Sequence, residues 1–148
     1  MQFVALQFIH LTGRELFEIY KLRSAVFVVE QNCAYQDVDD KDILAHHLML
    51  YDETQLVGYC RILPPTVSYN QPSIGRVCVA QARRKNGTGK LLMKKAINET
   101  LELFDNQDIV IFAQYYLFKF YTDLGFKQEG KEYLEDDISH VQMRYKSL

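Results

Sequence analysis

The chain has 148 residues, of which 48% are hydrophobic and 24% charged, and its formal net charge is −2. This length predicts a single domain over residues 1–148, and the composition is typical of soluble globular proteins. The slightly acidic balance provides no basic surface for nucleic acid, and no apolar run approaches the length of a membrane span, so neither partner is expected.

Cysteine usage and carboxylate spacing bear on the compartment and on metal binding. Cys33, Cys60 and Cys78 are an odd number without C-x-x-C spacing, which argues against a disulfide framework or a zinc site and suits a reducing cytoplasm. Residues 1–11 lack the basic n-region of a signal peptide. The aspartates of residues 37–42 lack the glycine and glutamate of a calcium loop. We therefore expect a cytoplasmic protein without a metal site.

The first part of the chain predicts a strand, a helix and a hairpin. Residues 3–9 read as a strand, and Thr12 with Glu15 forms a capping box that begins a helix running to about Phe27. An irregular acidic segment follows over residues 30–42. Residues 45–51 and 56–63 predict a hairpin, which ends at two prolines.

The second part of the chain alternates strands and helices before it ends in a second hairpin. We expect strands over residues 74–79 and 108–113, and helices over residues 88–104 and 115–124. The last two strands are predicted over residues 126–133 and 140–145. This order predicts an α/β or α+β domain with a mixed sheet.

A glycine-containing loop lies between the strand at 74–79 and the long helix. It reads Arg84-Lys85-Asn86-Gly87-Thr88-Gly89-Lys90, and the N–H groups at the helix start are free to bind an anion. The spacing matches neither a Walker loop nor a dinucleotide fingerprint. The loop therefore predicts a phosphate or pyrophosphate site, and the alternative is a surface loop that happens to carry glycines and charge.

Several blocks in order resemble a known superfamily. Val77-x-Val79, Arg84-x-x-Gly87-x-Gly89 and a long helix precede Phe120-Tyr121-x-x-x-Gly125-Phe126. This arrangement resembles the GNAT superfamily of N-acetyltransferases. Further motifs, spread over nearly the whole chain, look like its ElaA-like branch: Arg23-x-x-Val26-Phe27-Val28-x-Glu30-Gln31, Tyr35-Gln36-Asp37, Arg61-Ile62-Leu63, Gly75-Arg76-Val77, and His140 with Met143.

The resemblance implies a fold and a donor site. The fold is a mixed, mostly antiparallel twisted sheet flanked by helices, and the acetyl donor is acetyl-CoA. Pantetheine would pair with the backbone of Val77, Cys78 and Val79, where an N–H could act as oxyanion donor. Gln114 stands where many members have a cofactor-binding Asn. The pyrophosphate would lie on the N–H groups of Arg84, Lys85, Asn86, Gly87, Thr88, Gly89 and Lys90.

The resemblance also implies Tyr121 as the catalytic residue beside the leaving thiolate. A tyrosine pKa of ~10 against a thiol pKa of ~8.5 makes full proton transfer uphill by roughly 2 kcal/mol, so we expect mainly a hydrogen-bond donor. The alternative is an ordinary core aromatic residue. For the general base, Glu30 is the first candidate and His140 the second, each with a structural role as the alternative.

The predicted function is transfer of an acetyl group from acetyl-CoA to a primary amine, by direct attack in a ternary complex. Deprotonating a lysine-like amine at pH 7 costs about 4.6 kcal/mol, which is why a base is useful. The acceptor would be a small molecule or peptide, drawn by the acidic segment at residues 30–42, unless that segment is a solvated loop. The family pattern also suggests that Arg61 and Arg76 balance the carboxylates of this segment in the core. The alternative function is a non-catalytic acyl-CoA-binding or regulatory module. The many aromatic residues would suit a homodimer.

Overall fold

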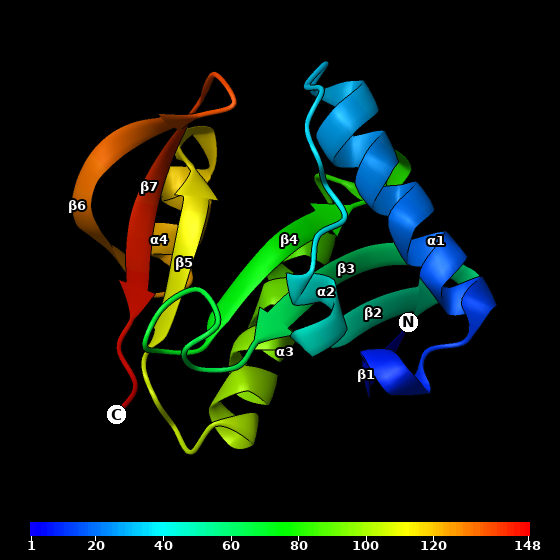
Figure 1. The fold of residues 1–148 in the computed structure, drawn as a ribbon, viewed down its shortest axis with the longest axis horizontal. Coiled ribbons are helices and arrows are strands. Elements are labelled where there is room, and N and C mark those ends of the chain that lie inside the picture. Colours follow the sequence, from blue (N-terminus) through cyan, green and yellow to red (C-terminus); the bar gives the residue numbers. More distant parts are fainter.

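Seven strands form one twisted sheet in the order β1-β2-β3-β4-β5-β7-β6 in the computed structural model, which describes residues 1–148 (Figure 1). All neighbouring strands are antiparallel except β4 and β5, which are parallel. The prediction of a mixed, mostly antiparallel sheet is therefore confirmed. The strands are β1 (Gln2–Gln7), β2 (His46–Asp52), β3 (Gln55–Leu63), β4 (Ser73–Val79), β5 (Ile109–Gln114), β6 (Phe126–Glu135) and β7 (Ile138–Tyr145).

Helices cover both faces of the sheet, with α1 and α2 in front of it and α3 and α4 behind it in Figure 1. The capping box at Thr12 and Glu15 is present at the start of α1, as predicted. The parallel pair β4 and β5 is joined by α3, as a crossover connection requires. The helices are α1 (Gly13–Arg23), α2 (Lys41–Leu44), α3 (Thr88–Leu103) and α4 (Phe118–Asp123).

The segment between α1 and β2 differs from the prediction both near its start and near its end. The helix does not stop near Phe27 but continues as a π-helical segment, Ser24–Glu30, and α2 forms inside the region predicted to be irregular. Val28 and Val29 are β-branched and have a low helix propensity, so local sequence understates this helix. Packing of Val26 against the sheet stabilises it instead.

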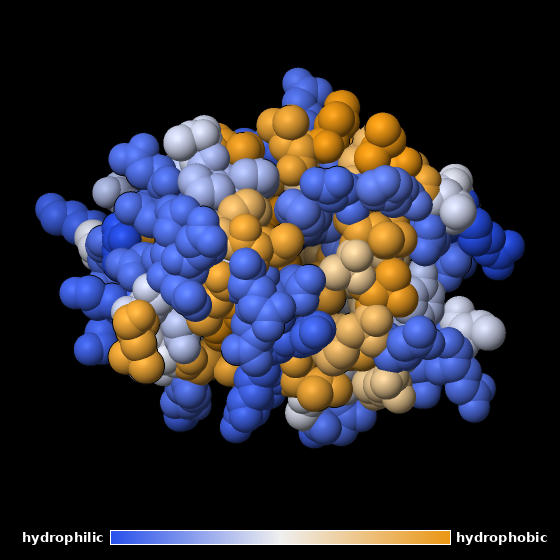
Figure 2. Space-filling model, turned by 90° about the horizontal axis from the view of Figure 1, so that it is seen from below, coloured by the Kyte–Doolittle hydropathy of each residue, from blue (hydrophilic) through white to orange (hydrophobic).

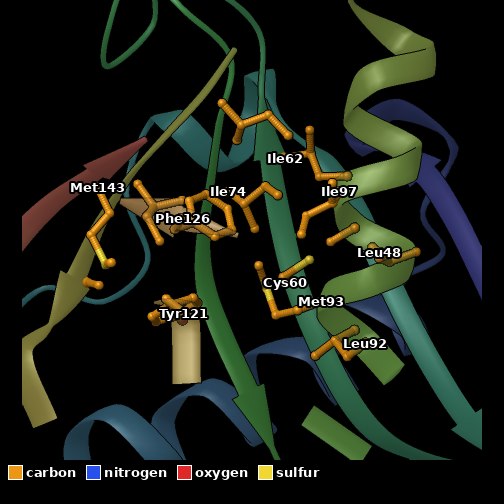
Figure 3. Packing of buried hydrophobic residues seen from close by; sticks show 14 of the residues in the cluster. Leu48, Cys60, Ile62, Ile74, Leu92, Met93, Ile97, Tyr121, Phe126 and Met143 are labelled. Carbon is orange, nitrogen blue, oxygen red and sulfur yellow. The ribbon is translucent and has the colours of Figure 1, made fainter. Parts of the chain in front are cut away.

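Two apolar clusters, one on each face of the sheet, form the core. Along β2, Leu48 and Leu50 belong to the cluster of α3, whereas Met49 between them belongs to the cluster of α1. This alternation is the period of two that a strand imposes. Figure 3 shows the α3 side chains pointing at the strands, with Tyr121 and Phe126 completing the cluster.

The outer surface retains apolar side chains. Seen from below, apolar side chains lie across the middle of the face, among hydrophilic side chains that also form its margins (Figure 2). Exposed apolar residues of the whole chain include Ile9, Ile43 and Leu44. A homodimer remains a prediction. None of the helices combines the length and apolar character needed to cross a membrane.

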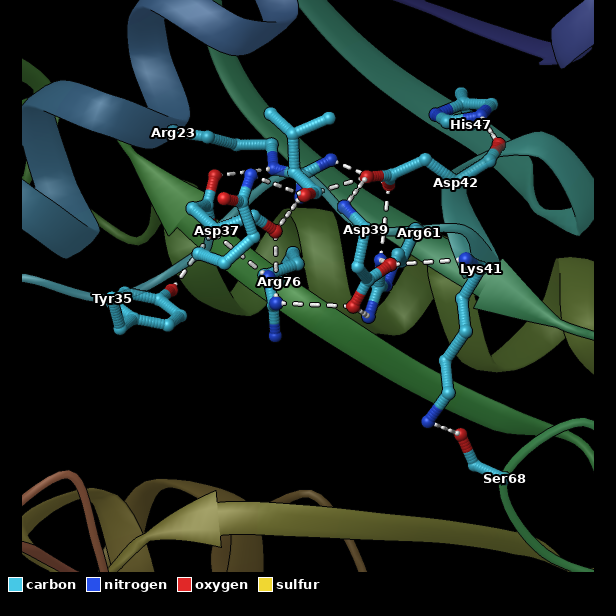
Figure 4. A network of polar contacts seen from close by, with 12 residues as sticks. Arg23, Tyr35, Asp37, Asp39, Lys41, Asp42, His47, Arg61, Ser68 and Arg76 are labelled. Carbon is cyan, nitrogen blue, oxygen red and sulfur yellow. Dashed lines mark hydrogen bonds and ion pairs between the residues drawn. The ribbon is translucent and has the colours of Figure 1, made fainter.

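Three arginines and three aspartates form a largely buried network between residues 31–45 and the sheet (Figure 4). Arg23 of α1 donates to Asp37 at 3.0 Å and to Asp42 at 2.6 Å. Arg61 of β3 also donates to Asp42, at 3.0 Å. The other contacts join Arg61 to Asp39, and Arg76 to Asp37 and Asp39. This arginine–aspartate network fixes a segment that has little regular structure.

His47 connects the network to the core. Its Nε2 donates to the Asp42 carbonyl at 2.8 Å, and its Nδ1 lies 2.7 Å from the Tyr59 hydroxyl. In the neutral imidazole Nδ1 accepts the hydroxyl hydrogen of Tyr59, so both hydrogen bonds form without a charge on the ring. Burial lowers the pKa of His47, and the guanidinium groups of Arg23 and Arg61 act in the same direction.

We predict that the folded protein loses stability between about pH 7 and about pH 5. An unfolded histidine takes up a proton near its ordinary pKa of ~6.5, before the folded His47 does, so the free energy of unfolding falls as pH decreases. Urea denaturation across this range measures the slope. His47→Gln should reduce it, leaving the part due to His46, whose pKa burial also lowers. An unchanged slope in this variant would contradict the assignment.

Candidate active site

The site begins where β4 and β5 diverge. The two strands share one register pair, Ser73 with Val110, next to a backbone hydrogen bond from Val110 to the Pro72 carbonyl at 3.0 Å. Beyond it they separate toward their C-terminal ends (Figure 1). A cavity of about 520 Å³ lies between them, and residues of both strands line it. Strand ends that leave a crevice of this kind are common ligand sites in α/β proteins.

A β-bulge shapes the β4 wall of this cavity. Tyr59 pairs with Cys78 and Arg61 with Gly75, so Arg76 and Val77 together oppose the single residue between them on β3. Arg76 accordingly has a φ of 50°. Such a bulge bends the strand and re-aims its side chains. Of the three residues predicted along pantetheine, Val77 lines the cavity.

Cys78 is buried and offers no nucleophile. Burial raises the pKa of its thiol to about 12, which keeps it protonated at neutral pH. Cys60 is also buried, and burial raises its pKa. Cys33 is half-buried and lines the cavity.

The glycine-containing loop leads into α3 as the sequence predicts. Gly87 is the residue before the helix, with a φ of 86°, and no side chain caps the helix start. The Thr88 hydroxyl donates to Asn86 instead, at 2.6 Å, and the first turn carries no acidic residue. The N–H groups of the first turn therefore remain free, and the helix dipole favours an anion there.

Gly89 lies where the loop meets β4 and α4. A Cβ at Gly89 would lie 3.6 Å from the Phe120 ring and 3.9 Å from a Val79 methyl group. The cationic side chains of Lys85 and Lys90 belong to the same loop. The arrangement suits a phosphate or diphosphate group, because it combines free N–H groups with positive charge.

Arg84 is committed to other partners. Its Nε donates to the Val79 carbonyl at 3.0 Å, and its two terminal nitrogens donate to Glu30 at 2.6 and 3.0 Å. Glu30, the last residue of the π-helical segment, therefore forms a bidentate ion pair with Arg84. It is not among the residues that line the cavity. The structure brings the first candidate base to the loop rather than to the cavity.

Tyr121 lines the cavity with its hydroxyl group protonated. Only 6% of the residue is exposed, and its ring meets Phe120 and Phe126 edge-on. Burial raises its pKa, and nearby Cys60, Tyr116 and Cys78 act in the same direction.

His140 and Gln114 face each other in register on β7 and β5 and both line the cavity. His140 stacks on Phe112 with ring centroids 4.9 Å apart, and its Nδ1 donates to the Ile138 carbonyl at 2.7 Å. The neutral ring therefore keeps the Nε2 lone pair free. The Gln114 and Gln31 side-chain amides exchange hydrogen bonds of 3.0 and 3.3 Å across the cavity wall.

The acidic segment has a different environment from the one predicted. Asp37 and Asp42 are buried, and guanidinium groups already occupy the carboxylates of Asp37, Asp39 and Asp42. The attraction of a cationic acceptor by these aspartates therefore loses its physical basis. The suggestion that Arg61 and Arg76 balance them agrees with the structure.

Arg23 and Gln31 are site-supporting residues that motif reasoning did not assign. A signal for Arg23 exists in the sequence, because it continues the apolar stripe of Leu16, Ile19 and Tyr20 at helical spacing. A charged residue on such a stripe indicates a buried partner. No local pattern indicates the pairing of Gln31 with Gln114.

Comparisons with known proteins agree with this geometry. The family described as Acetyltransferase (GNAT) domain matches residues 17–147. A UPF0039 protein of Schizosaccharomyces pombe is 42% identical over 97% of this chain and 96% of its own. The crystal structure of an acyl-CoA N-acyltransferase from Pseudomonas aeruginosa has a TM-score of 0.91 at 38% identity, covering 97% of this chain and 99% of the other.

Escherichia coli ElaA is a further relative with a solved structure. Its TM-score is 0.90 at 34% identity, and the match covers 99% of this chain and 100% of ElaA. The chain therefore belongs to the GNAT superfamily of N-acetyltransferases and, within it, to the ElaA-like branch.

Proposed function

We propose that this acetyltransferase moves the acetyl group of acetyl-CoA to a primary amine, which attacks the thioester directly while both substrates are bound. The observation that carries the proposal is the cavity between the diverging strands β4 and β5. It is lined by Tyr121 and His140, and β4 leads from it to the uncapped start of α3. One continuous surface thus offers an anion site, free strand backbone and groups that handle protons.

The donor side uses backbone groups. The first turn of α3 would bind the diphosphate through its N–H groups, with Lys85 and Lys90 adding positive charge. The edge of β4 beyond Ser73 has no strand partner on the β5 side, so it can pair with the amides of pantetheine. This places the thioester near the bulge at Val77.

Tyr121 would stabilise the thiolate that leaves when the acetyl group is transferred. Its raised pKa makes complete proton transfer to the thiolate still less favourable than it is for a free tyrosine. The side chain therefore acts as a hydrogen-bond donor whose partner gains negative charge in the transition state. Such a donor lowers the barrier without losing its own proton early.

His140 is better placed than Glu30 to accept the proton of the amine. The Nδ1–H bond to Ile138 orients the ring and leaves Nε2 as a proton acceptor, and His140 lines the cavity together with Tyr121. Glu30 is held by two hydrogen bonds from Arg84. Its role in this proposal is to fix Arg84 beside the donor loop.

Turnover with amines is the test of the function, and Tyr121→Phe is the test of its mechanism. Thiol release from acetyl-CoA should depend on an added amine, measured with diamines, amino acids, aminoglycosides and peptides. Tyr121→Phe should lower kcat by ~10²-fold when chemistry is rate-limiting. Its packing against Phe120 and Phe126 is retained, so the thermal midpoint should stay the same.

Tyr145→Phe is the matched control for this experiment. Tyr145 contacts the same Phe126 ring but does not line the cavity, so its hydroxyl should have no effect on kcat. Equal kcat values for wild type and Tyr121→Phe would refute the donor role. Tight binding of acetyl-CoA without turnover on the whole panel would favour a binding module, and a labelled acetyl group trapped on the protein would refute direct attack.

Gly87→Ala should weaken binding of CoA through the backbone alone. The space around Gly87 is open, but an alanine at φ 86° is strained by roughly 1–2 kcal/mol, so the loop should shift. Titration calorimetry should show a Kd for CoA raised ~5-fold or more, with little change for S-acetylpantetheine, which lacks the diphosphate. Gly87→Asn tolerates this conformation better and should restore much of the affinity. Equal losses for both ligands would argue against a diphosphate site.

The two candidate bases can be separated by kinetics. His140→Gln should lower kcat by ~10²-fold and remove the rise of kcat/KM with pH that a histidine base produces. Glu30→Gln should leave kcat within a fewfold of wild type and alter KM for acetyl-CoA, because it frees Arg84. The reverse pattern would return the base assignment to Glu30.

A further inference from the structure

Arg76 occupies an unusual position in β4. At the bulge Arg76 has a φ of 50°, a conformation that glycine adopts more readily. The neighbouring glycine, Gly75, does not adopt it. A side chain in the left-handed region costs roughly 1–2 kcal/mol, and such residues persist where the surrounding structure holds them and gather at functional sites. The bulge brings this arginine to the cavity wall.

The guanidinium group of Arg76 is held along one edge only. Nε lies 2.9 Å from Asp37 Oδ1, and Nη2 donates to the Asp37 carbonyl at 2.9 Å and to Asp39 Oδ2 at 3.4 Å. Nη1 makes no hydrogen bond within the chain. Figure 4 shows the far end of the group pointing away from the network, toward the strand on the other side of the gap.

The other two arginines of the network differ in this respect. Arg23 is fully buried, with Nε, Nη1 and Nη2 all donating to Asp37 or Asp42. Arg61 uses both terminal nitrogens on Asp39 and Asp42, and its side chain is 5% exposed. Arg76 is 22% exposed. It alone presents a terminal nitrogen that has no partner in the chain to the cavity.

The charges around the cavity suit a ligand with two different ends. The three guanidinium groups and three carboxylates of the network balance one another, and Lys41 adds a positive charge on this side, where its Nζ donates to Ser68 at 2.7 Å. The end of β6 contributes Glu135 to the lining, and the β6–β7 turn contributes Asp136. A guanidinium N–H pairs best with a carboxylate oxygen, and carboxylates attract ammonium groups.

We propose that Arg76 binds a carboxylate of the acceptor through Nη1, so that the acceptor is an amine that also carries a carboxylate, as an amino acid does. This inference rests on the proposed acetyl transfer and names the class of its acceptor. Asp37 and Asp39 hold the guanidinium in place before the acceptor arrives. Arg76 is thus a specificity-determining residue that also belongs to the network.

The test compares acceptors that differ only in the carboxylate. L-lysine against cadaverine and L-ornithine against putrescine are such pairs. For wild type, kcat/KM should be ~10-fold or more higher for the carboxylated member of a pair, as expected for a charge-assisted hydrogen bond. Arg76→Gln should reduce this ratio to about one, chiefly through a higher KM for the amino acid. Arg76→Lys, which keeps the charge, should retain part of the preference.

The ratio of kcat/KM between the two acceptors, taken within each variant, separates a loss of carboxylate recognition from a general loss of structure. Both members of a pair meet the same protein, and the thermal midpoint and Kd for CoA report whether the variant folds. A wild type without preference, or an Arg76→Gln variant that keeps it, would overturn the proposal while acetyl transfer stands.

A second measurement does not depend on turnover. Calorimetry on the CoA complex should show that Nε-acetyl-L-lysine binds ~10-fold or more tightly than N-acetylcadaverine in wild type, and equally in Arg76→Gln. Equal binding in wild type would overturn the role of Arg76. A lack of turnover with every amine, together with preferential binding of the carboxylated product, would overturn the proposed function instead.

Discussion

The position of one wall of the cavity depends on the buried pairing of three arginines with three aspartates. Residues 31–45 have one short helix, so their backbone alone cannot hold one conformation against the sheet. Arg23, Arg61 and Arg76 reach them from α1, β3 and β4. Removing one partner of a buried ion pair costs about 3–5 kcal/mol, a large share of the 5–15 kcal/mol that stabilises a typical domain.

A charged network is not the most stabilising way to hold a segment. Apolar residues of similar volume often stabilise a fold as well or better, because burying charges carries a large desolvation penalty. The network provides a property that apolar packing lacks, which is a fixed direction for each side chain. Because Asp37 and Asp39 hold one edge of Arg76, its other edge has to face the cavity. The same contacts thus fix the loop and supply a polar group to the site.

The sequence predicts the elements well because each carries a local periodic signal. The hairpin β2–β3, the long helix α3 and the glycine loop follow from alternation, helical spacing and the position of Gly87 and Gly89. The π-helical segment Ser24–Glu30 does not, because its valines favour strands and only packing stabilises it.

Spacing along the chain could not give the individual long-range pairings, for a different reason. Asp42 accepts a hydrogen bond from Arg61, which is 19 residues away along the chain. Asp37 accepts one from Arg76, which is 39 residues away. No spacing rule connects such residues. The acidic segment was therefore interpreted as a free acidic surface, although its carboxylates face arginines. Glu30, the first candidate base, likewise forms an ion pair with Arg84, 54 residues away along the chain, and no spacing rule indicates that pair.

This contrast explains why the donor is easier to assign than the acceptor. The proposed donor half consists of free backbone N–H groups and an open strand edge, and short motifs that fix the backbone reveal them. The proposed acceptor half consists of side chains, such as those of Arg76 and His140, which come from different elements and line one cavity. A single substitution there changes the chemistry without changing the fold or the glycine loop. Related chains can therefore keep the donor site and accept different amines, with Arg76 as the position at which the difference should be sought first.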